Sequence, residues 1–410
     1  MNIWIFNHYA ITPKSSGGTR HYDLASELVK RNYQVTIFAS SFEHQSRTDP
    51  NITGPKEKVK TESIDGITYK WIKTVKYKKN DIKRIWNMIG YTWRSFFAAI
   101  KTKENPDVVV GSLVHPLAAF LGYIISRMKG SLFYFEERDL WPQTLIDLGL
   151  VSKRHPAVKL LSWLELFLYK KADRIIILFK EAEDYIESRG ISKEKVLVIP
   201  NGVDLKRYNR PKELPPLLNE LFNTQLKDHF KAIYIGSHGV TDHLEPVLLS
   251  AKRLMEKESN VCMLFFGDGP EKEKLIKMKE AEKLDNVLFF PPVPKEYIPK
   301  LLENCDAGLL SMHDSELYKW GMSFNKLYDY TAAKLPIVLN SKRVLPELAK
   351  FGNIEWAKSH NEFADTLETL SNDKDQCEQL GMIGRDFLER NYTWEILSTR
   401  LIDALEKDVK

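Results

Sequence analysis

Short and almost entirely apolar runs alternate with helix-length amphipathic segments along most of the chain. Runs that are apolar throughout, rather than at every second position, are typical of strands buried on both faces, as in a parallel sheet covered by helices. The pattern therefore predicts two doubly wound α/β units in succession. The expected strands lie at residues 2–7, 34–40, 107–112, 131–137, 174–179 and 195–200, and then at 231–237, 261–269, 286–291, 307–312 and 335–340.

The segment VIPNGVD, residues 198–204, lies near the middle of the chain and indicates where the first unit ends. Its apolar residues run directly into Pro200, Asn201 and Gly202, which are residues that terminate strands and allow unusual backbone angles. The alternation of strands and helices resumes after a Pro- and Leu-rich stretch at residues 210–218. We therefore expect a domain boundary near residue 203.

Length and composition agree with a two-domain protein that does not bind nucleic acid. A chain of 410 residues is too long for one ordinary core, and its net charge is only +5. The three cysteines are far apart and none has Cys-x-x-Cys spacing, which predicts neither disulfides nor a zinc site and suits a reducing cytoplasm. No apolar run approaches the length of a membrane span.

Two doubly wound domains that face each other form a cleft between the carboxyl ends of their strands, where such sheets bind ligands. Glycine lets a backbone approach a ligand closely, and the amino end of a following helix offers free N–H groups to an anion. The Gly-rich loops that follow the predicted strands match neither the dinucleotide fingerprint nor the Walker motif. The alternative is therefore that they are ordinary turns. The glycines in question are Gly17 and Gly18 in the first half, and Gly236, Gly239, Gly267 and Gly269 in the second.

The clearest candidate chemistry lies in residues 321–339, GMSFNKLYDYTAAKLPIVL. A loop ends at Ser323 and a helix is expected to open near Asn325, so that Lys326 and Asp329 lie on one face of its first turns. Lys326 and the helix dipole would bind a diphosphate, and Asp329 would bind ribose hydroxyls. The alternative is an ordinary surface ion pair.

These segments occur together in a recognisable order: VIPNGVD, YIGSHGVTDHLEP, FFGDGP, SFNKLYDYTAAKLPIVL and RNYTW. Over essentially its whole length the chain resembles the retaining glycosyltransferases of family 4. The resemblance implies the α/β GT-B fold, in which two doubly wound Rossmann-like domains face each other across a cleft. It implies an acceptor domain at 1–203, a nucleotide-sugar donor domain at 204–390, and a terminal helix at 391–410 that crosses back to the first domain.

The segment FEERDLWPQTLIDLG, residues 135–149, is similar to bacterial transferases of N-acetylfucosamine and related amino sugars in surface-polysaccharide assembly. The resemblance thus implies transfer of an N-acetylated amino sugar from a nucleotide diphosphate sugar, with UDP expected, to a lipid-linked saccharide with retention. The product would belong to capsule, O-antigen (lipopolysaccharide) or exopolysaccharide synthesis. The nucleotide sugar is a co-substrate, and no cofactor or metal is expected. A non-hydrolysing sugar-nucleotide epimerase and a non-catalytic sugar-nucleotide sensor are the alternatives.

The donor-site residues of the family can be carried over in part. Lys326 matches the diphosphate-binding Lys, and Asp329 matches the second acid of the Glu-x7-Glu motif, a ribose contact. The first Glu of that motif falls at Gly321, so Glu316 is the candidate substitute. The Arg that many relatives have in the Gly-rich loop is absent, which leaves His238 and backbone N–H groups for the phosphates.

In the first half, Glu136, Arg138 and Asp139 follow a strand where relatives place a polar residue beside the anomeric carbon of the donor. A double displacement would need a carboxylate there, and Glu136 and Asp139 are its candidates; the resemblance instead implies same-face attack by the acceptor hydroxyl. Capping or ion pairing is the ordinary alternative for these charges. His115 opens a helix and is either a group of the cleft or part of a helix cap.

The stretch Lys70–Lys103 contains ten Lys or Arg and one acid, Asp81. Within it, apolar residues at helical spacing form one stripe, which is either the core-facing side of a helix or a membrane-binding face. We expect peripheral association with the inner, cytoplasmic face of the cell membrane, through an anionic surface, and a polyprenyl-diphosphate-linked saccharide as acceptor. The stripe comprises Ile82, Ile85, Trp86, Ile89, Trp93, Phe96, Phe97 and Ile100, beside Lys76, Lys78, Lys79, Lys83 and Arg84.

Overall fold

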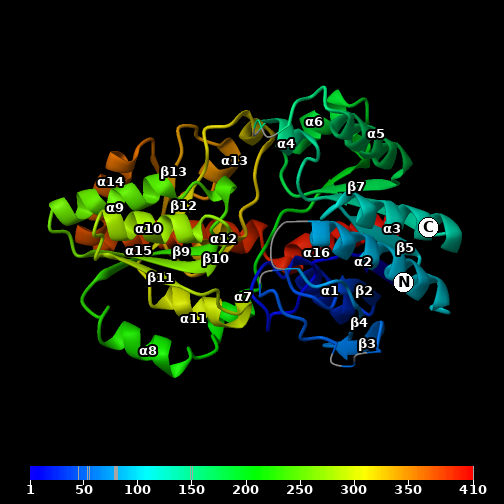
Figure 1. Ribbon diagram of the computed structural model, residues 1–410, viewed down its shortest axis with the longest axis horizontal. Helices are drawn as coiled ribbons and strands as arrows, with labels where there is room; N and C mark the ends of the chain where they lie inside the picture. Colours follow the sequence, from blue (N-terminus) through cyan, green and yellow to red (C-terminus); the bar gives the residue numbers. More distant parts are fainter. Residues whose placement is uncertain are drawn as a thin grey trace.

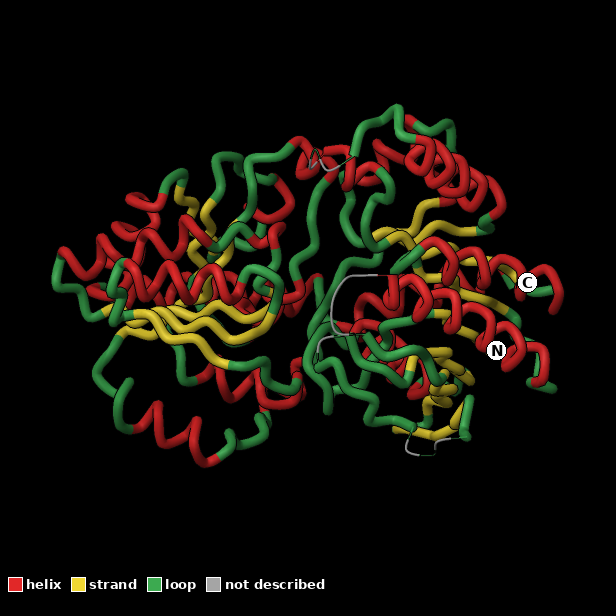
Figure 2. The backbone as a smooth tube through the Cα atoms, in the orientation of Figure 1, coloured by secondary structure: helices red, strands yellow, loops and turns green. Residues whose placement is uncertain are grey.

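The computed structural model describes residues 1–44, 46–52, 54, 56–77, 82–147, 149 and 151–409. It contains two separate sheets, one in each half of the chain, with helices on both faces of each (Figures 1 and 2). The first is eight-stranded with the order β3-β4-β2-β1-β5-β6-β7-β8, and the second is six-stranded with the order β11-β10-β9-β12-β13-β14. The predicted fold class is therefore confirmed.

All neighbouring strands of the first sheet pair in parallel, apart from the antiparallel hairpin of β3 and β4 at one edge. This hairpin turns at Asp65 and Gly66, which both have positive φ, as a tight Asp-Gly turn requires. It was not among the expected strands. The strands are β1 (Asn2–Phe6), β2 (Gln34–Ser40), β3 (Val59–Ile64), β4 (Ile67–Ile72), β5 (Val108–Ser112), β6 (Leu132–Glu137), β7 (Arg174–Ile177) and β8 (Val196–Val198).

Six helices follow or connect the strands of the first sheet, and the second sheet is parallel throughout its described pairings. The helices are α1 (Arg20–Lys30), α2 (Ile82–Lys101), α3 (Pro116–Lys129), α4 (Gln143–Asp147), α5 (Pro156–Lys171) and α6 (Ala182–Ser188). The strands of the second sheet are β9 (Phe230–Ser237), β10 (Val261–Asp268), β11 (Val287–Phe290), β12 (Ala307–Ser311), β13 (Ile337–Asn340) and β14 (Ile354–Ala357).

The remaining helical elements are α-helices and short 3-10 turns, most of which belong to the second domain. The α-helices are α7 (Leu205–Asn209), α8 (Pro216–Asn223), α9 (Glu245–Glu256), α10 (Lys272–Ala281), α11 (Ile298–Glu303), α12 (Asn325–Ala332), α13 (Pro346–Ala349), α14 (His360–Asn372), α15 (Lys374–Asn391) and α16 (Trp394–Asp408). The 3-10 turns are η1 (Lys193–Lys195), η2 (Val240–Asp242), η3 (Lys295–Tyr297) and η4 (Glu316–Trp320).

The last helix, α16, leaves the second domain and packs into the core of the first, where Figure 1 shows it in red beside the blue and cyan elements. Trp394, Leu397 and Leu401 are buried there with residues of β1 and β5. Near the end of α16, Asp408 accepts two hydrogen bonds of 2.7 Å from Arg174 and one of 2.7 Å from Tyr134. Charged and apolar contacts thus both fix the chain end to the first domain.

The two crossings between the domains meet at VIPNGVD. Val203 and Thr393 form an isolated parallel bridge, with hydrogen bonds of 3.0 Å from Val203 N to Tyr392 O and 3.1 Å from Trp394 N to Val203 O. A Cβ added at Gly202 would lie 2.7 Å from both the Leu397 side chain and the Tyr392 carbonyl oxygen. Gly202 is therefore needed because the return helix passes directly against the linker.

Further contacts hold the domains against each other. On one side, Lys295 N and Glu296 N donate to the carbonyl oxygens of Ser15 and Pro13 at 3.0 and 3.1 Å. On the other, η4 packs against α4 and α6, with the Trp320 ring 5.2 Å from that of Tyr185. The structure is therefore a closed arrangement of the two domains.

Helix α2 turns its apolar stripe outward, so the core-facing interpretation of that stripe is wrong. Trp86 and Trp93 are 57% and 64% exposed, and Phe96 is the half-buried exception within the stripe. The buried face of α2 instead carries the small or polar positions Asn87, Tyr91, Ser95 and Ala99. Among the described residues, no helix is long and apolar enough to cross a membrane.

The packing of α16 predicts that Leu397→Ala destabilises the protein by about 2–5 kcal/mol, since a fully buried leucine would leave a cavity in the first domain. Urea denaturation would measure the change. Asp403→Ala, an exposed position on the same helix, is the matched control and should change the free energy of unfolding by no more than about 0.5 kcal/mol. Equal effects of the two substitutions would contradict this account of α16.

Candidate active site

Lys326 lies in the first turn of α12 and reaches the Gly-rich loop at the end of β9. Its Nζ donates hydrogen bonds of 2.7 Å to Asp242 Oδ1 and 2.6 Å to the Tyr234 hydroxyl, and lies 4.0 Å from the centroid of the Tyr234 ring. A Cβ added at Gly236 would lie only 3.2 Å from this ammonium. The structure therefore brings together Lys326 and Gly236, which the sequence placed in one donor site.

The glycines after β9 and β10 bring these two loops into contact with each other. A Cβ at Gly267 would lie 1.7 Å from the Gly236 carbonyl oxygen, and one at Gly269 would lie 2.4 Å from the His238 carbonyl oxygen. Gly239 N donates to Asp242 at 3.3 Å, which shapes the turn η2. The close packing of the two loops therefore explains why residues 267 and 269 are glycine, and open space for a ligand is not the reason.

The His238 side chain is fully buried beneath these loops. It lies 5.8 Å from the rings of Tyr234 and Phe289, and burial lowers its pKa to about 4, with Lys272 acting in the same direction. A neutral, enclosed imidazole cannot contact a diphosphate without repacking. The expectation that its side chain substitutes for a phosphate-binding Arg is therefore not met in this arrangement, and backbone N–H groups are left for that role.

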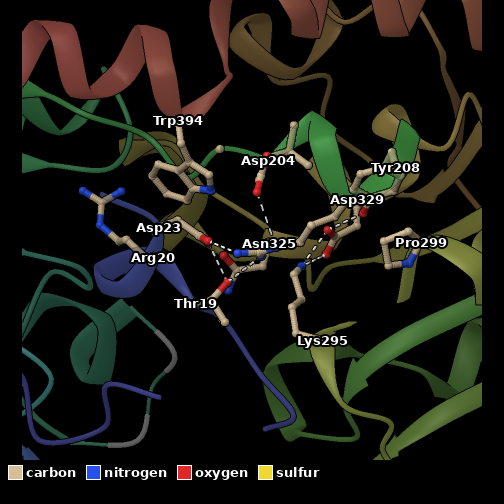
Figure 3. A pocket seen from close by; sticks show the side chains of 14 residues that line it. Thr19, Arg20, Asp23, Asp204, Tyr208, Lys295, Pro299, Asn325, Asp329 and Trp394 are labelled. Atoms are coloured by element: carbon tan, nitrogen blue, oxygen red, sulfur yellow. Dashed lines mark hydrogen bonds and ion pairs between the residues drawn. The ribbon is translucent and has the colours of Figure 1, made fainter. Parts of the chain in front are cut away.

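Asp329 lies in an interdomain pocket next to the linker, and it is only 4% exposed (Figure 3). Its carboxylate accepts hydrogen bonds of 2.5 and 2.6 Å from Lys295 and one of 2.7 Å from the Tyr208 hydroxyl. It therefore connects α12 to η3 and α7. A ribose would have to displace one of these partners to reach it.

The opposite wall of the same pocket carries Gly18 and Asn325. A Cβ at Gly18 would lie 2.9 Å from Asn325 Nδ2, so glycine here allows the first domain to approach α12. Gly17 has a φ of +128°, a conformation that also favours glycine. In the closed structure this loop contacts protein where a ligand had been expected.

Glu136 is the centre of a buried polar cluster at the carboxyl ends of β1, β5 and β6. Arg20 donates to its Oε1 at 2.8 Å, while His21 and Ser112 contact its Oε2 at 2.7 and 2.6 Å. Burial alone would raise the pKa of Glu136, but His21 and Arg20 outweigh burial and hold it well below the ordinary value. Both oxygens of Glu136 are bonded and the residue is only 1% exposed. Glu136 is therefore a structural anion and not the nucleophile of a double displacement.

Arg138 and Asp139 follow Glu136 at the end of β6 and lie nearer to solvent. Arg138 is half-buried and the Asp139 side chain is exposed, although the surrounding protein desolvates the carboxylate enough to raise its pKa against the opposing effect of Arg138. Of the two carboxylates proposed for a double displacement, Asp139 is therefore the accessible one.

His115 caps α3, as the structural alternative predicted. Its Nδ1 accepts a 3.3 Å hydrogen bond from Ala118 N, and its Nε2 lies 2.8 Å from His8 Nδ1. Burial, aided by Arg84, lowers its pKa to about 3, so the ring is neutral. The neutral tautomer that accepts at Nδ1 donates from Nε2 to His8.

Glu316 does not take the place of the missing first Glu. Its side chain is 61% exposed and pairs with Arg343, Nη2 to Oε1, at 2.6 Å. Within the part of the chain that the structure describes, no group of three His, Cys, Asp or Glu is arranged to hold a metal ion. Sequence reasoning also missed Arg20, His21 and Lys295, whose roles depend on partners far away in the chain.

Each half of the chain matches a known protein family. The model of Glycosyltransferase Family 4 matches residues 17–207, and that of Glycosyl transferases group 1 matches residues 220–387. The chain belongs to the GT-B glycosyltransferases. The Anabaena protein HepE in complex with UDP-glucose has the same fold, with a TM-score of 0.69 and 13% identity over 99% of this chain and 100% of that one.

Two curated relatives are similar in sequence. The probable glycosyltransferase WbjE of Pseudomonas aeruginosa is 22% identical over 354 residues, covering 84% of this chain and 85% of that protein. The putative colanic acid biosynthesis glycosyl transferase WcaI of Escherichia coli is 24% identical over 235 residues. The match to WcaI spans 56% of each chain, little more than half of that relative.

The buried cluster predicts that Glu136→Gln costs about 3–5 kcal/mol in the free energy of unfolding, because it leaves the Arg20 guanidinium buried without its counter-charge. Chemical denaturation would measure this change. The control Glu62→Gln, which breaks a half-exposed pair with Lys60, should cost less than about 1 kcal/mol. A loss of under 1 kcal/mol for Glu136→Gln would show that the pair does not stabilise the fold.

Proposed function

We propose that the chain transfers a sugar, with retention of configuration, from a nucleoside diphosphate to a saccharide acceptor in bacterial surface-polysaccharide synthesis. The observation that carries the proposal is the position of the Lys326 ammonium at the end of β9, 3.2 Å from where a Cβ on Gly236 would lie. The resemblance of residues 135–149 to amino-sugar transferases supports an N-acetylated amino sugar as the group transferred. The name of WcaI supports a polysaccharide product.

UDP is the nucleotide that the comparison favours, because HepE, which shares the fold, is known with UDP-glucose. Lys326 would donate to the diphosphate in place of its present partner Asp242, at the positive end of the α12 dipole. In that case the Lys326–Asp242 pair opens when the donor binds. After this exchange of partners, the Lys326 ammonium would lie beside the diphosphate oxygen whose bond to the sugar breaks.

In the proposed reaction the acceptor hydroxyl oxygen forms a bond to the anomeric carbon while the bond from that carbon to the diphosphate oxygen breaks. The hydroxyl proton passes to the departing phosphate, and the nucleoside diphosphate leaves from the face on which the acceptor arrives. Lys326 stabilises the negative charge that builds on the leaving group. Both carboxylate oxygens of Glu136 are already bonded, to Arg20, His21 and Ser112. This favours same-face attack by the acceptor over a route in which Glu136 is the nucleophile.

The exposed face of α2 supports a lipid-linked acceptor. Trp86 and Trp93 lie there in solvent. Helix α5 of the same domain has exposed apolar side chains of its own, Leu160 and Trp163, at 64% and 61% exposure. Cations lie beside this face, including Lys76, Lys83 and Arg84, whereas Lys78, Lys79 and Asp81 are outside the described residues. Aromatic side chains beside cations suit an anionic bilayer, which attracts each Lys or Arg by about 1 kcal/mol. A polyprenyl-diphosphate-linked saccharide would be reached from there.

The function is tested by incubating the protein with UDP-, GDP- and dTDP-sugars and a membrane extract. Wild-type protein should transfer a sugar, and Lys326→Ala should lose roughly two orders of magnitude or more in rate, as other losses of leaving-group stabilisation do. Met382→Ala, an exposed position on α15, is the control for handling and folding. Activity of Lys326→Ala within a few-fold of wild type would remove Lys326 from the mechanism, and isomerised donor without acceptor would favour an epimerase.

Membrane association predicts that the protein floats with phosphatidylglycerol vesicles at low salt and is released at high salt. Trp86→Ser combined with Trp93→Ser should weaken partition at least about tenfold, because two exposed aromatic side chains no longer enter the interface. Leu217→Ser, which removes an 82% exposed apolar side chain from the second domain, should change nothing. Equal binding to neutral and anionic vesicles would contradict the electrostatic part of the proposal.

A further inference from the structure

The segment between η4 and α12 passes directly beneath a carboxylate of the other domain. Gly321, which lies on this segment, has a φ of +88°, and a Cβ added to it would lie 2.4 Å from Glu181 Oε2 and 3.1 Å from Phe179 Cβ. Glu181 belongs to the first domain, in the turn between β7 and α6. A side chain at position 321 and the carboxylate of Glu181 would therefore occupy the same space.

Glu181 is half-buried between the domains, and among the described residues no Lys or Arg is close enough to form an ion pair with it. Lys350, whose charge acts on Glu181 without forming an ion pair with it, is itself paired with Glu347. Burial raises the pKa of Glu181 and Glu347 adds to this effect, while a hydrogen bond from its own backbone and the charge of Lys350 oppose it. Partial burial of a carboxylate without a counter-charge is costly, and its oxygens keep capacity to accept hydrogen bonds from a ligand.

The position of Glu181 relative to α12 suggests what that ligand is. Gly321 lies two residues before Ser323, whose hydroxyl accepts a 3.1 Å hydrogen bond from Asn201 Nδ2 of the linker, and five before Lys326. The carboxylate thus overhangs the segment that leads to the diphosphate-binding end of α12. In a bound nucleotide sugar, the group attached to the diphosphate is a sugar ring rich in hydroxyls.

We propose that Glu181 binds hydroxyl groups of the transferred sugar from the acceptor domain. Glycine at 321, which the positive φ already favours, also leaves the space that the carboxylate occupies. The inference rests on the proposed function. It assigns to the first domain a donor contact that Glu316, paired with Arg343 in solvent, does not make. Because Glu181 and α12 come together only across the domain interface, this contact makes recognition of the sugar depend on closure.

The test is calorimetric titration of the full chain with UDP, UDP-glucose and UDP-N-acetylglucosamine. In Glu181→Gln the affinity for the better sugar nucleotide should fall about 10- to 100-fold, since hydrogen bonds to a charged group are lost, while the affinity for UDP stays within about threefold. Glu187→Gln, which removes an exposed carboxylate of α6, the helix that follows Glu181, is the control and should alter neither. Equal loss of affinity for UDP and for the sugar nucleotides, or no loss, would overturn the inference.

Gly321→Ala gives a second measurement that removes no charge. Its Cβ should displace the Glu181 carboxylate and reduce the preference for sugar nucleotide over UDP in the same direction. Glu181→Asp keeps the charge and should retain part of that preference, which separates loss of the acceptor oxygens from loss of folding. An unchanged preference in Gly321→Ala would also overturn the inference, whereas a wild-type protein that binds none of the three probes would overturn the assignment of UDP as the donor nucleotide.

Discussion

The buried carboxylate of Glu136 is the contact on which the arrangement of the cleft depends. It joins α1, through Arg20 and His21, to the end of β5 at Ser112. Arg20 also donates a 2.7 Å hydrogen bond to the carbonyl oxygen of Pro200, where the chain enters the linker. Because an unpaired charge in this position would be costly, the strand ends and the linker are fixed together. The need to keep this buried charge paired therefore sets the geometry of the cleft floor.

Charged pairs within the second domain already occupy the candidate binding groups of the cleft, and one further pair joins the linker to the first domain. Lys326 is paired with Asp242, and Lys295 with Asp329. Arg207 of the linker helix α7 pairs with Asp23 of α1, which ties the linker to the first domain. Lys326, the cation proposed to meet the diphosphate, therefore already has an anionic partner. A ligand that binds there would exchange one charged partner for another. This costs less free energy than leaving a buried charge without a partner.

Helix α2 shows why amphipathic pattern alone does not decide which face is inside. Its apolar stripe was compatible with a core-facing side, yet the helix buries Asn87, Tyr91 and Ser95. Asn87 Nδ2 donates to Thr74 Oγ1 at 2.8 Å, and the Tyr91 hydroxyl donates to the Phe38 carbonyl oxygen at 2.7 Å. Small and hydrogen-bonded side chains allow close contact with the sheet. The aromatic residues are left outside, where a bilayer or another apolar partner would cover them.

The sequence by itself determined the two doubly wound domains and the end of the last strand of the first domain just before Pro200 to Gly202. Apolar runs and glycines decide such features because they act through local backbone geometry and burial. Tertiary structure alone decided the fate of the charged groups. Glu136 became a structural anion through Arg20, 116 residues away, and Glu181 came to lie over Gly321 from the other domain. A charge takes its role from the partner that folding brings to it, and no spacing along the chain encodes that partner.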